Sequence, residues 1–514
     1  AVERFIARYA EQVTGVLSAF DRMLFRGTLR SLTRADAAEH WLCWKKVLFK
    51  DYGPFVQKQS ARLREHAEAM AREAGRPYEH LRSSRISKEK IAEGLLQRDK
   101  IQEGLVCVLT AVEPCMSYSV RKNPSTGYLH LVREERKCLF LYFYFVDRKI
   151  GLMHVRLETW FPYDVQVCLN GREWLARQMD RVGLKYERRD NCFARLEDPV
   201  RTQELANAQV DTNWNSMLDH FVRRVNPLLK DLLKGLSYYW TVREGELATD
   251  VMFRDAESLA RIYPTLIDHA MRTFHSEDVL RFLGSRLHGN FEGNVETTLK
   301  RRIEGLRIRH TVYENSIKMY DKQGSVLRIE TTINNPRRFQ AYRRARRQGQ
   351  LTMAWLPMRQ GVADMHRRVE VSRAANFRYL EALALIPQAQ PARQILDRVS
   401  APVRTRSRSS RALRPIAPQD AGVFEALLRG EFLLAGFRNR DLRSALFPEK
   451  PSTPEEQRRR SSHTTRWLRL LHAHNLVRKI SKTRRYLLSK RGVTVMAAAL
   501  AVRHADLSVF GMTA

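Results

Sequence analysis

The stretch that decides the fold runs from Asn315 to Asn334, NSIKMYDKQGSVLRIETTIN. Apolar and polar side chains alternate along both halves, and Gln323-Gly324 between them is a typical turn sequence. A period of two places successive side chains on opposite faces of a strand. The stretch therefore predicts two antiparallel strands, which belong to a meander that begins near residue 303.

Segments of the same kind extend the predicted sheet over the first part of the chain. The strand candidates, rich in β-branched and aromatic residues, are Val16–Leu29, Leu105–Val167 and Leu247–Phe253. Apolar spacings of three and four, typical of helices, cover residues 35–101, most of 200–285 and the stretch before Ala384. We therefore expect an α+β region over residues 1–385, with a mainly antiparallel sheet and helical insertions.

The last part of the chain has a different organisation. Residues 386–419 are rich in Pro, Ser and Arg and lack apolar periodicity, which predicts a linker. In residues 420–514, helical patterns precede two short strand patterns joined by a basic turn. This order resembles the winged-helix superfamily, which implies a DNA-binding domain whose third helix enters the major groove. A winged helix that binds another protein is the alternative.

Helical spacing assigns roles within this module. Leu468, Leu471 and Leu476 should pack inward, and Asn439 should be the N-cap of the second helix. The residues expected to contact DNA from the third helix and the basic turn are Ser462, Thr465, Arg466, Arg469, Lys482, Arg484 and Arg485.

The net charge of the chain indicates what kind of partner it binds. The chain contains 90 Lys and Arg against 56 Asp and Glu, a formal net charge of +34, and residues 401–514 carry +15 of it. Such self-repulsion indicates a polyanion, with DNA expected and RNA the alternative. A second basic cluster should bind phosphates, or else form a solvated basic helix face; its arginines are Arg337, Arg338, Arg343, Arg344, Arg346 and Arg347.

Other classes of protein are disfavoured. The apolar run Cys138–Val146 is much shorter than the ~20 residues that span a bilayer, and the first residues lack a signal-peptide pattern, so no membrane partner is expected. The six cysteines include no C-x-x-C pair. We therefore expect no zinc site, no disulfide framework, and a reducing, cytoplasmic and nucleoid-associated location. A phosphate-binding loop of the G-x-x-x-x-G-K-[ST] type is also missing, which disfavours an NTP-driven motor.

Charged residues inside strand patterns are the catalytic candidates. Lys318 and Tyr320 should share one strand face, and Arg328 and Glu330 another. A buried sheet seldom holds so many charges without pairing or function, although a hairpin with its charges in water is the alternative. Asp21 and Asp250 lie between apolar neighbours on other strands.

Carboxylates from separate strands can converge on Mg²⁺ or Mn²⁺, as phosphoryl transfer requires. The predicted metal ligands are Glu330, Asp250 and His154, which precedes Glu158 by four residues. The predicted catalytic residues are Glu330, Asp250, Asp21, Tyr320 and Lys318.

Short segments resemble the rolling-circle replication initiators of filamentous phages and small plasmids. These are Phe20-Asp-Arg-Met-Leu-Phe25, Lys318-Met-Tyr-Asp-Lys322 and Leu327-Arg-Ile-Glu330, roughly 30 residues in all with their surroundings. The resemblance implies single-strand nicking by a tyrosine, with one Mg²⁺ or Mn²⁺ polarising the phosphate. Tyr238 and Tyr239 compete with Tyr320 for the role of nucleophile. The family's His-hydrophobic-His metal triplet is missing from this chain.

The sequence therefore predicts a mobile-element or plasmid-type DNA-binding protein that nicks DNA as a replication initiator or transposase. The alternatives are an RNase H-like two-metal nuclease that uses Asp21, Asp250 and Glu330, and a non-catalytic RNA- or DNA-binding protein, such as a ribonucleoprotein component or a transcriptional regulator. An enzyme should bring at least two of Asp21, Asp250, Asp321 and Glu330 within metal-bridging reach in a concave site. In a binding protein, these carboxylates should be dispersed and separately salt-bridged.

Overall fold

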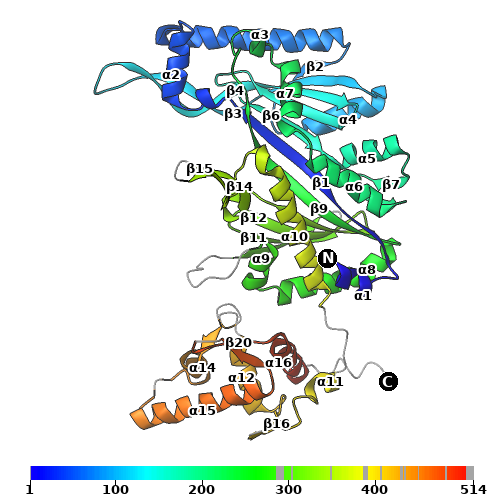
Figure 1. Ribbon diagram of the computed structural model, residues 1–514, viewed down its shortest axis with the longest axis vertical. Helices are drawn as coiled ribbons and strands as arrows, with labels where there is room; N and C mark the ends of the chain where they lie inside the picture. Colours follow the sequence, from blue (N-terminus) through cyan, green and yellow to red (C-terminus); the bar gives the residue numbers. More distant parts are fainter. Residues whose placement is uncertain are drawn as a thin grey trace. The chain divides into compact units, whose positions relative to one another are not determined.

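The computed structural model describes residues 2–284, 295–302, 305–347, 350–385, 392–405, 408–428, 432, 436–449, 451–480 and 483–504 (Figure 1). The chain forms two compact units. The first comprises residues 1–273 and 278–384, and the second comprises residues 274–277 and 385–514. The protein is α+β, as the sequence predicts.

An eleven-stranded sheet is the centre of the first unit. Its strands, in spatial order, are β10 (Glu296–Arg302), β11 (Gly305–Val312), β12 (Asn315–Lys322), β13 (Val326–Thr332), β9 (Tyr239–Phe253), β1 (Val13–Thr28), β6 (Val165–Asn170), β5 (Gly151–Glu158), β4 (Leu129–Asp147), β3 (Gly104–Lys122) and β2 (Tyr78–His80). Among the described residues, only β2 and β3 pair in parallel, and α4 (Lys88–Asp99) forms the crossover that a parallel pair requires. The prediction of a mainly antiparallel sheet is confirmed.

The predicted meander is present as β11, β12 and β13. In its hairpin Lys318 lies opposite Glu330, and Tyr320 lies opposite Arg328. Gln323 and Gly324 between the strands both have positive φ, 56° and 81°, the backbone conformation that a tight hairpin turn needs. The alternation of side chains therefore fixes the register, and it brings the four predicted charged or polar residues to one face.

Helices bury both faces of the sheet. The largest apolar core lies under α2 (Ala35–Trp44), α3 (Tyr52–Glu73), α7 (Trp214–Val225) and α10 (Met365–Leu383). Two smaller cores on the opposite face contain α4 and α5 (Gly171–Val182). The first unit also contains the α-helices α1 (Glu3–Arg8), α6 (Pro199–Val210), α8 (Ala256–Thr273) and most of α9 (Ser276–Phe282), and the hairpins β7 (Tyr186–Arg189)–β8 (Cys192–Leu196) and β14 (Gln340–Arg347)–β15 (Gln350–Pro357).

The second unit has its own core. Its elements are α11 (Ala392–Leu396), β16 (Val403–Thr405), β17 (Arg408–Ser410), α12 (Pro418–Leu427), β18 (Phe437–Arg438), α14 (Asn439–Leu446), α15 (Pro454–Ala473), β19 (Val477–Lys479), β20 (Arg485–Leu488) and α16 (Lys490–Arg503). Strands β18, β20 and β19 form an antiparallel sheet in that order. Leu468, Leu471 and Leu476 are buried in this core, which confirms their predicted orientation.

Two expectations for this region are wrong. The described part of residues 386–419 is not a linker, because Leu396, Val399 and Leu413 are buried in the core of the second unit. A few irregularly spaced apolar residues are enough to anchor a Pro- and Ser-rich segment, and periodicity cannot reveal them. Residues 386–391 and 406–407 of that segment lie outside the described residues.

The predicted N-cap is displaced by one residue. Helix α14 begins at Asn439 itself, and Arg438 is the capping position. The Asn439 amide instead donates to Ser461 O and Thr465 Oγ1 on α15, at 3.3 and 2.9 Å. Asn439 therefore links two helices, because the short strand β18 carries the chain directly into α14.

In the described part of the chain, no helix combines the length and the apolar character that crossing a bilayer demands.

Candidate functional site

One face of the large sheet carries a set of charged side chains that we term the buried charge cluster. It consists of Asp21, Arg172, Glu246, Asp250, Lys318, Tyr320, Arg328 and Glu330. The register explains most of the set, because Arg328 is opposite Asp250 in β9 and Tyr320 in β12. Arg172 enters from the first turn of α5.

Asp21 reaches the cluster because β1 is irregular at this point. The register of β1 against β9 shifts between Phe20 and Met23. Phe20 is buried in the main apolar core, whereas the Asp21 carboxylate accepts hydrogen bonds from Arg328 and Asn191. Irregularities of this kind re-aim side chains next to functional sites.

Arg328 holds the inner half of the cluster together. Its guanidinium donates to both oxygens of Asp250, at 2.7 and 2.9 Å, and to Asp21. Arg172 lies 3.1 Å from the second Asp250 oxygen. The Arg328 and Asp250 side chains are each only 1% exposed. Both oxygens of Asp250 are thus bound to arginine, so Asp250 is a structural ion-pair partner and not the predicted metal ligand.

Lys318 holds the outer half of the buried charge cluster together, as Arg328 holds the inner half. Its ammonium lies 2.5 Å from Glu330 Oε1 and 3.1 Å from Glu246 Oε1, and Tyr320 donates to Glu330 Oε2 at 2.7 Å. Burial opposes the Glu330 charge, but the Lys318 ammonium holds the pKa of Glu330 below its usual value. Burial and repulsion from Glu330 raise the pKa of Glu246 to about 7. The Glu246 side chain is 25% exposed, so the cluster reaches solvent at this residue.

Part of the cluster has the spacing of a cation site. One oxygen from each of Asp21, Glu246 and Glu330 lies within 4.8 Å of the others. Lys318 already contacts two of these three carboxylates. The test that separates an enzyme from a binding protein therefore gives a mixed result. Asp21 and Glu330 lie within metal-bridging reach, as expected of an enzyme, but both are buried and each is paired with an internal cation, as expected of a binding protein.

His154 lies far from this cluster. It is on β5, and three strands, β6, β1 and β9, separate it from Glu330 on β13. With about 4.8 Å between neighbouring strands, His154 cannot share an ion with Glu330 or Asp250. Burial lowers the pKa of His154 to about 3, and its ring packs against Tyr144 with 4.9 Å between centroids. The prediction of His154 as a ligand of that ion is wrong, because the intervening strands hold His154 too far from the carboxylates.

The candidate tyrosines differ in their surroundings. Tyr320 contacts Glu330, and burial raises its pKa well above the usual value. Tyr238 is buried and donates to Tyr163 O at 2.8 Å. The Arg30 guanidinium stacks on the Tyr239 ring, 3.3 Å from its centroid. Of the three, Tyr320 lies beside the carboxylates.

The predicted arginine cluster spans two elements: Arg337 and Arg338 lie in a short 3-10 helix (Pro336–Arg338), and the later arginines lie on β14 of the β14–β15 ribbon. The alternative of a solvated basic helix face is therefore wrong. Tyr342, Arg344 and Arg346 lie opposite Trp355, Met353 and Leu351, and all six side chains are exposed. The Tyr342 and Trp355 rings are 5.3 Å apart, with exposed fractions of 55% and 54%. We call this surface the ribbon face.

A cavity of about 700 Å³ borders the ribbon and is lined in part by Tyr313, Arg338, Trp355 and Arg367. The Arg338 guanidinium lies 3.9 Å from the Tyr313 ring centroid. The other arginines that were predicted to bind phosphates lie in different surroundings. Arg337 is exposed, Arg343 is paired with Asp364 at 3.3 Å, and the Arg347 side chain lies outside the described residues.

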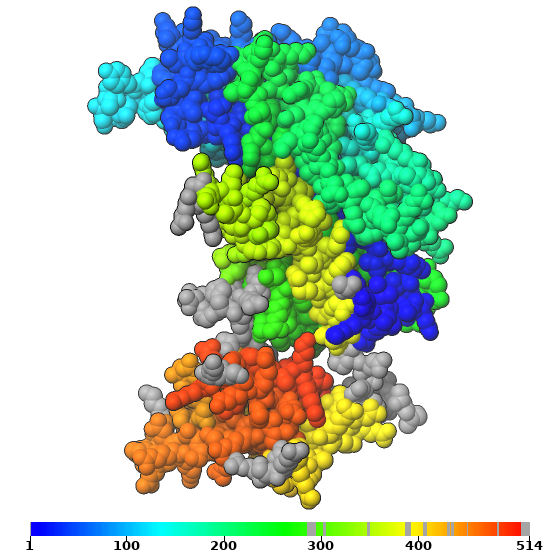
Figure 2. All heavy atoms as spheres, in the orientation of Figure 1, coloured from blue at the N-terminus to red at the C-terminus, as the bar shows by residue number. Residues whose placement is uncertain are grey.

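Helix α15 carries a basic stripe, which we define as Arg459, Ser462, Arg466 and Arg469. All four are exposed, and their spacing places them on one side of the helix. Figure 2 draws the atoms of the α15 part of the chain in orange. Thr465 is partly buried and bonded to Asn439, so it is less available than predicted. Arg484 and Arg485 are exposed beside β20, and Lys482 lies outside the described residues.

Comparisons with known proteins do not assign the chain. No protein-family description matches it, and no curated protein matches it. A solved structure, "Crystal structure of the di-domain ARO/CYC BexL from the BE-7585A biosynthetic pathway", has 9% identity and a TM-score of 0.15, covering 55% of this chain and 99% of its own. A likeness at that level carries no argument about fold or function.

Sequence reasoning missed two members of the buried charge cluster. Glu246 could have been found, because it precedes Asp250 by four residues in a strand and so shares its face. Arg172 carries no such signal, because it follows a turn and enters the cluster through tertiary packing alone.

Proposed function

We propose that the protein binds DNA through its second unit, as a winged-helix domain. The observation that carries the proposal is the order of elements: helix α12, strand β18, helices α14 and α15, then strands β19 and β20, with β20 between the other two in the sheet. A winged helix has this arrangement, and its third helix reads the major groove. Here the third helix is α15, which bears the basic stripe.

The ribbon face supports a second nucleic-acid contact. Exposed arginines bind phosphates without regard to sequence, and exposed aromatic rings stack on unpaired bases. Tyr342, Trp355, Arg344 and Arg346 supply both kinds of group on one face. We propose that this face binds a single-stranded segment of DNA.

The test of the winged helix is a pair of matched double variants of the full chain. Arg466 and Arg469 change to Ala in one variant, and Arg393 and Arg398, exposed residues of the same unit outside α15, change to Ala in the other. Both remove two charges. We expect the first to weaken duplex binding by about 1–3 kcal/mol for each arginine that reads a base, and the second to act only through the general field. Fluorescence anisotropy at about 50 and about 200 mM salt measures both effects.

Equal losses of affinity in the two variants, or no loss in either, would show that α15 is not the recognition helix. A duplex affinity independent of salt would contradict the electrostatic basis of the proposal.

A second candidate function, metal-dependent strand nicking, is favoured by the carboxylates of Asp21, Glu246 and Glu330 beside Tyr320. In this proposal the carboxylates of Asp21, Glu246 and Glu330 would hold Mg²⁺ or Mn²⁺ in place of the Lys318 ammonium, and the ion would polarise the phosphate. The protein would act as a mobile-element or plasmid replication initiator or transposase. The Tyr320 oxygen attacks the phosphate while its proton passes to Glu330. The bond from phosphorus to the 3′ oxygen of the neighbouring nucleotide breaks, and that oxygen takes up the proton that Glu330 received, relayed by water.

Two variants separate nicking from a structural role. Glu330→Gln should abolish cleavage of single-stranded and supercoiled DNA in Mn²⁺ while duplex binding stays within about threefold. Lys318→Met removes the competing ammonium and should tighten Mn²⁺ binding, measured by electron paramagnetic resonance. Unchanged Mn²⁺ affinity in Lys318→Met, or undiminished cleavage in Glu330→Gln, would remove the cluster as the nicking site and leave DNA binding alone.

A further inference from the structure

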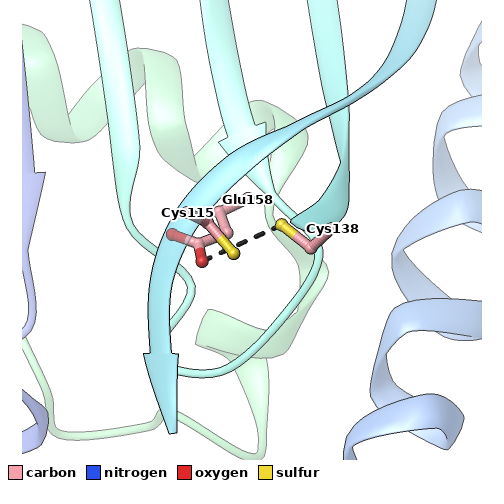
Figure 3. Close-up of side chains that lie close together, drawn as sticks. All are labelled: Cys115, Cys138 and Glu158. Atoms are coloured by element: carbon pink, nitrogen blue, oxygen red, sulfur yellow. Dashed lines mark hydrogen bonds between the residues drawn. The ribbon is translucent and has the colours of Figure 1, made fainter. Parts of the chain in front are cut away.

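Away from the surfaces described so far, three neighbouring strands bring two cysteines and a glutamate together. Cys115 lies on β3, Cys138 on β4 and Glu158 on β5 (Figure 3). Their Sγ and carboxylate atoms all lie within 4.8 Å of one another, and Cys138 Sγ is 3.9 Å from Glu158 Oε1. The side chains converge because Cys115 pairs with Arg136, two residues before Cys138, while Glu158 pairs with Phe140, two residues after it.

Glu158 differs from the other buried carboxylates. It is 3% exposed, and in the described part of the chain it has no salt bridge, whereas Glu330 has Lys318 and Asp250 has Arg328. Burial, together with repulsion from Asp164, raises the pKa of Glu158 well above its usual value. A buried carboxyl group without a cation is costly when ionised, so a cation bound beside it would lower that cost.

The chemical type of the ligand atoms determines which cation they favour. Thiolates favour Zn²⁺ over Mg²⁺ or Mn²⁺, which prefer oxygen ligands. Zn–S bonds of about 2.3 Å and Zn–O bonds of about 2.0–2.2 Å place tetrahedral ligands roughly 3.5–3.8 Å apart. The observed separations require the three side chains to close by about 1 Å or less, a movement that changes of χ angle can supply.

The structure also has room for a fourth coordination position and a path by which an ion can enter. A cavity of about 230 Å³ is lined by Cys115 and Glu158 together with Asp164, Arg156 and other residues, and it gives access for water and for an ion. The two thiols titrate as a pair, because their mutual hydrogen bond lowers the pKa of Cys115 and, together with burial, raises the pKa of Cys138. Two thiolates and a carboxylate around a divalent ion leave one net negative charge, next to the arginines Arg136 and Arg156, which act electrostatically on Cys115.

We propose that Cys115, Cys138 and Glu158 bind Zn²⁺, with the fourth coordination position open to the cavity. Binding releases the protons of the thiols and of the carboxyl group that are still protonated, so the affinity rises with pH. The site revises the expectation that the chain has no zinc site. That expectation rested on the lack of a C-x-x-C pair, and here the ligands come from separate strands whose sequence spacing forms no local pattern.

Cobalt reports the site directly, because thiolate ligands give Co²⁺ a strong charge-transfer absorption. We expect the full-length protein, stripped with a chelator and kept reduced with a phosphine, to bind one Co²⁺ per chain with this absorption. Zn²⁺ should displace it. Cys115→Ser and Cys138→Ser each remove one sulfur ligand, so neither variant should show the thiolate absorption of a site with two sulfurs. Glu158→Gln should weaken Co²⁺ binding at least tenfold. Cys43→Ser is the matched control, because Cys43 is an exposed thiol outside the site.

A measurement on the unmodified protein guards against variants that fail to fold. Zn²⁺ should slow alkylation of Cys115 and Cys138, followed by peptide mass spectrometry, and leave the rate at Cys43 unchanged. Equal protection of Cys43, no protection of Cys115, or a Co²⁺ spectrum that survives in a folded Cys115→Ser, Cys138→Ser double variant would overturn the proposal.

Discussion

Arginine side chains have opposite surroundings in two regions of this protein. In the buried charge cluster, Arg328 and Arg172 are almost completely buried, and each contacts carboxylates. On α15, Arg466 and Arg469 are exposed, and the structure shows no salt bridge to either among the described residues. A high net charge therefore does not by itself mark a binding surface. A buried arginine stabilises its partners, whereas an exposed and unpaired one remains available to phosphates.

The largest expected effect lies inside the sheet. Arg328→Met keeps the volume but removes the cation that Asp21 and Asp250 share. Leaving a buried carboxylate unpaired typically costs about 3–5 kcal/mol, so the free energy of unfolding of the first unit should fall by that amount. Urea denaturation measures it. A loss below about 1 kcal/mol, the range of an exposed pair, would show that the cluster is hydrated and that the contrast with the surface is false.

The next effect concerns the ribbon face. Trp355→Ala should weaken single-stranded DNA binding by about 1–3 kcal/mol, because stacking on an exposed ring contributes that much per base. Leu351→Ala is the matched control, since Leu351 lies on the same face and is 73% exposed but has no ring. Anisotropy with a labelled oligonucleotide distinguishes them. If both variants lose the same affinity, the face binds through apolar contact and not through stacking.

Glu246 belongs to the buried charge cluster but reaches solvent, and its contribution to stability depends on pH. Its pKa is raised to about 7 in the folded protein from an ordinary value of 4.5. A proton therefore binds the folded state more tightly than the unfolded state, and the stability that this provides in acid is lost as the pH rises from about 4.5 to about 7. Glu246→Gln does not titrate, so its stability relative to the wild type should increase across this window. A difference independent of pH would mean that Lys318 keeps Glu246 ionised throughout.

The smallest effect belongs to an exposed pair on α8. Arg261 and Glu257 are one helical turn apart, with side chains 68% and 82% exposed. Arg261→Ala should change the free energy of unfolding by less than about 0.5 kcal/mol, because water and salt screen such a pair. Measured beside Arg328→Met under the same conditions, it provides the scale for the buried cluster. A loss comparable with that of Arg328→Met would contradict the comparison between inside and outside.

Local pattern in the sequence determined a substantial part of the fold. Alternation along Asn315–Asn334 fixed the hairpin and its register, so the shared face of Lys318, Tyr320, Arg328 and Glu330 followed directly. Asn170 and Gly183 similarly mark the two ends of α5, as a side-chain N-cap and a left-handed residue at the C-cap. These features depend on neighbours in the chain, and sequence periodicity reports such neighbours well.

Tertiary structure decided what those residues do. Alternation shows that Glu330 faces one way, but only the assembled sheet shows that Lys318 already binds it and that three strands separate it from His154. The same holds for Leu396, Val399 and Leu413, whose burial depends on a core formed by later helices, and for Cys115, Cys138 and Glu158, which meet across three strands. The physical reason is that pairing and ligation depend on distances in space between residues far apart in the chain, whereas sequence pattern records only the direction in which each side chain leaves its own strand or helix.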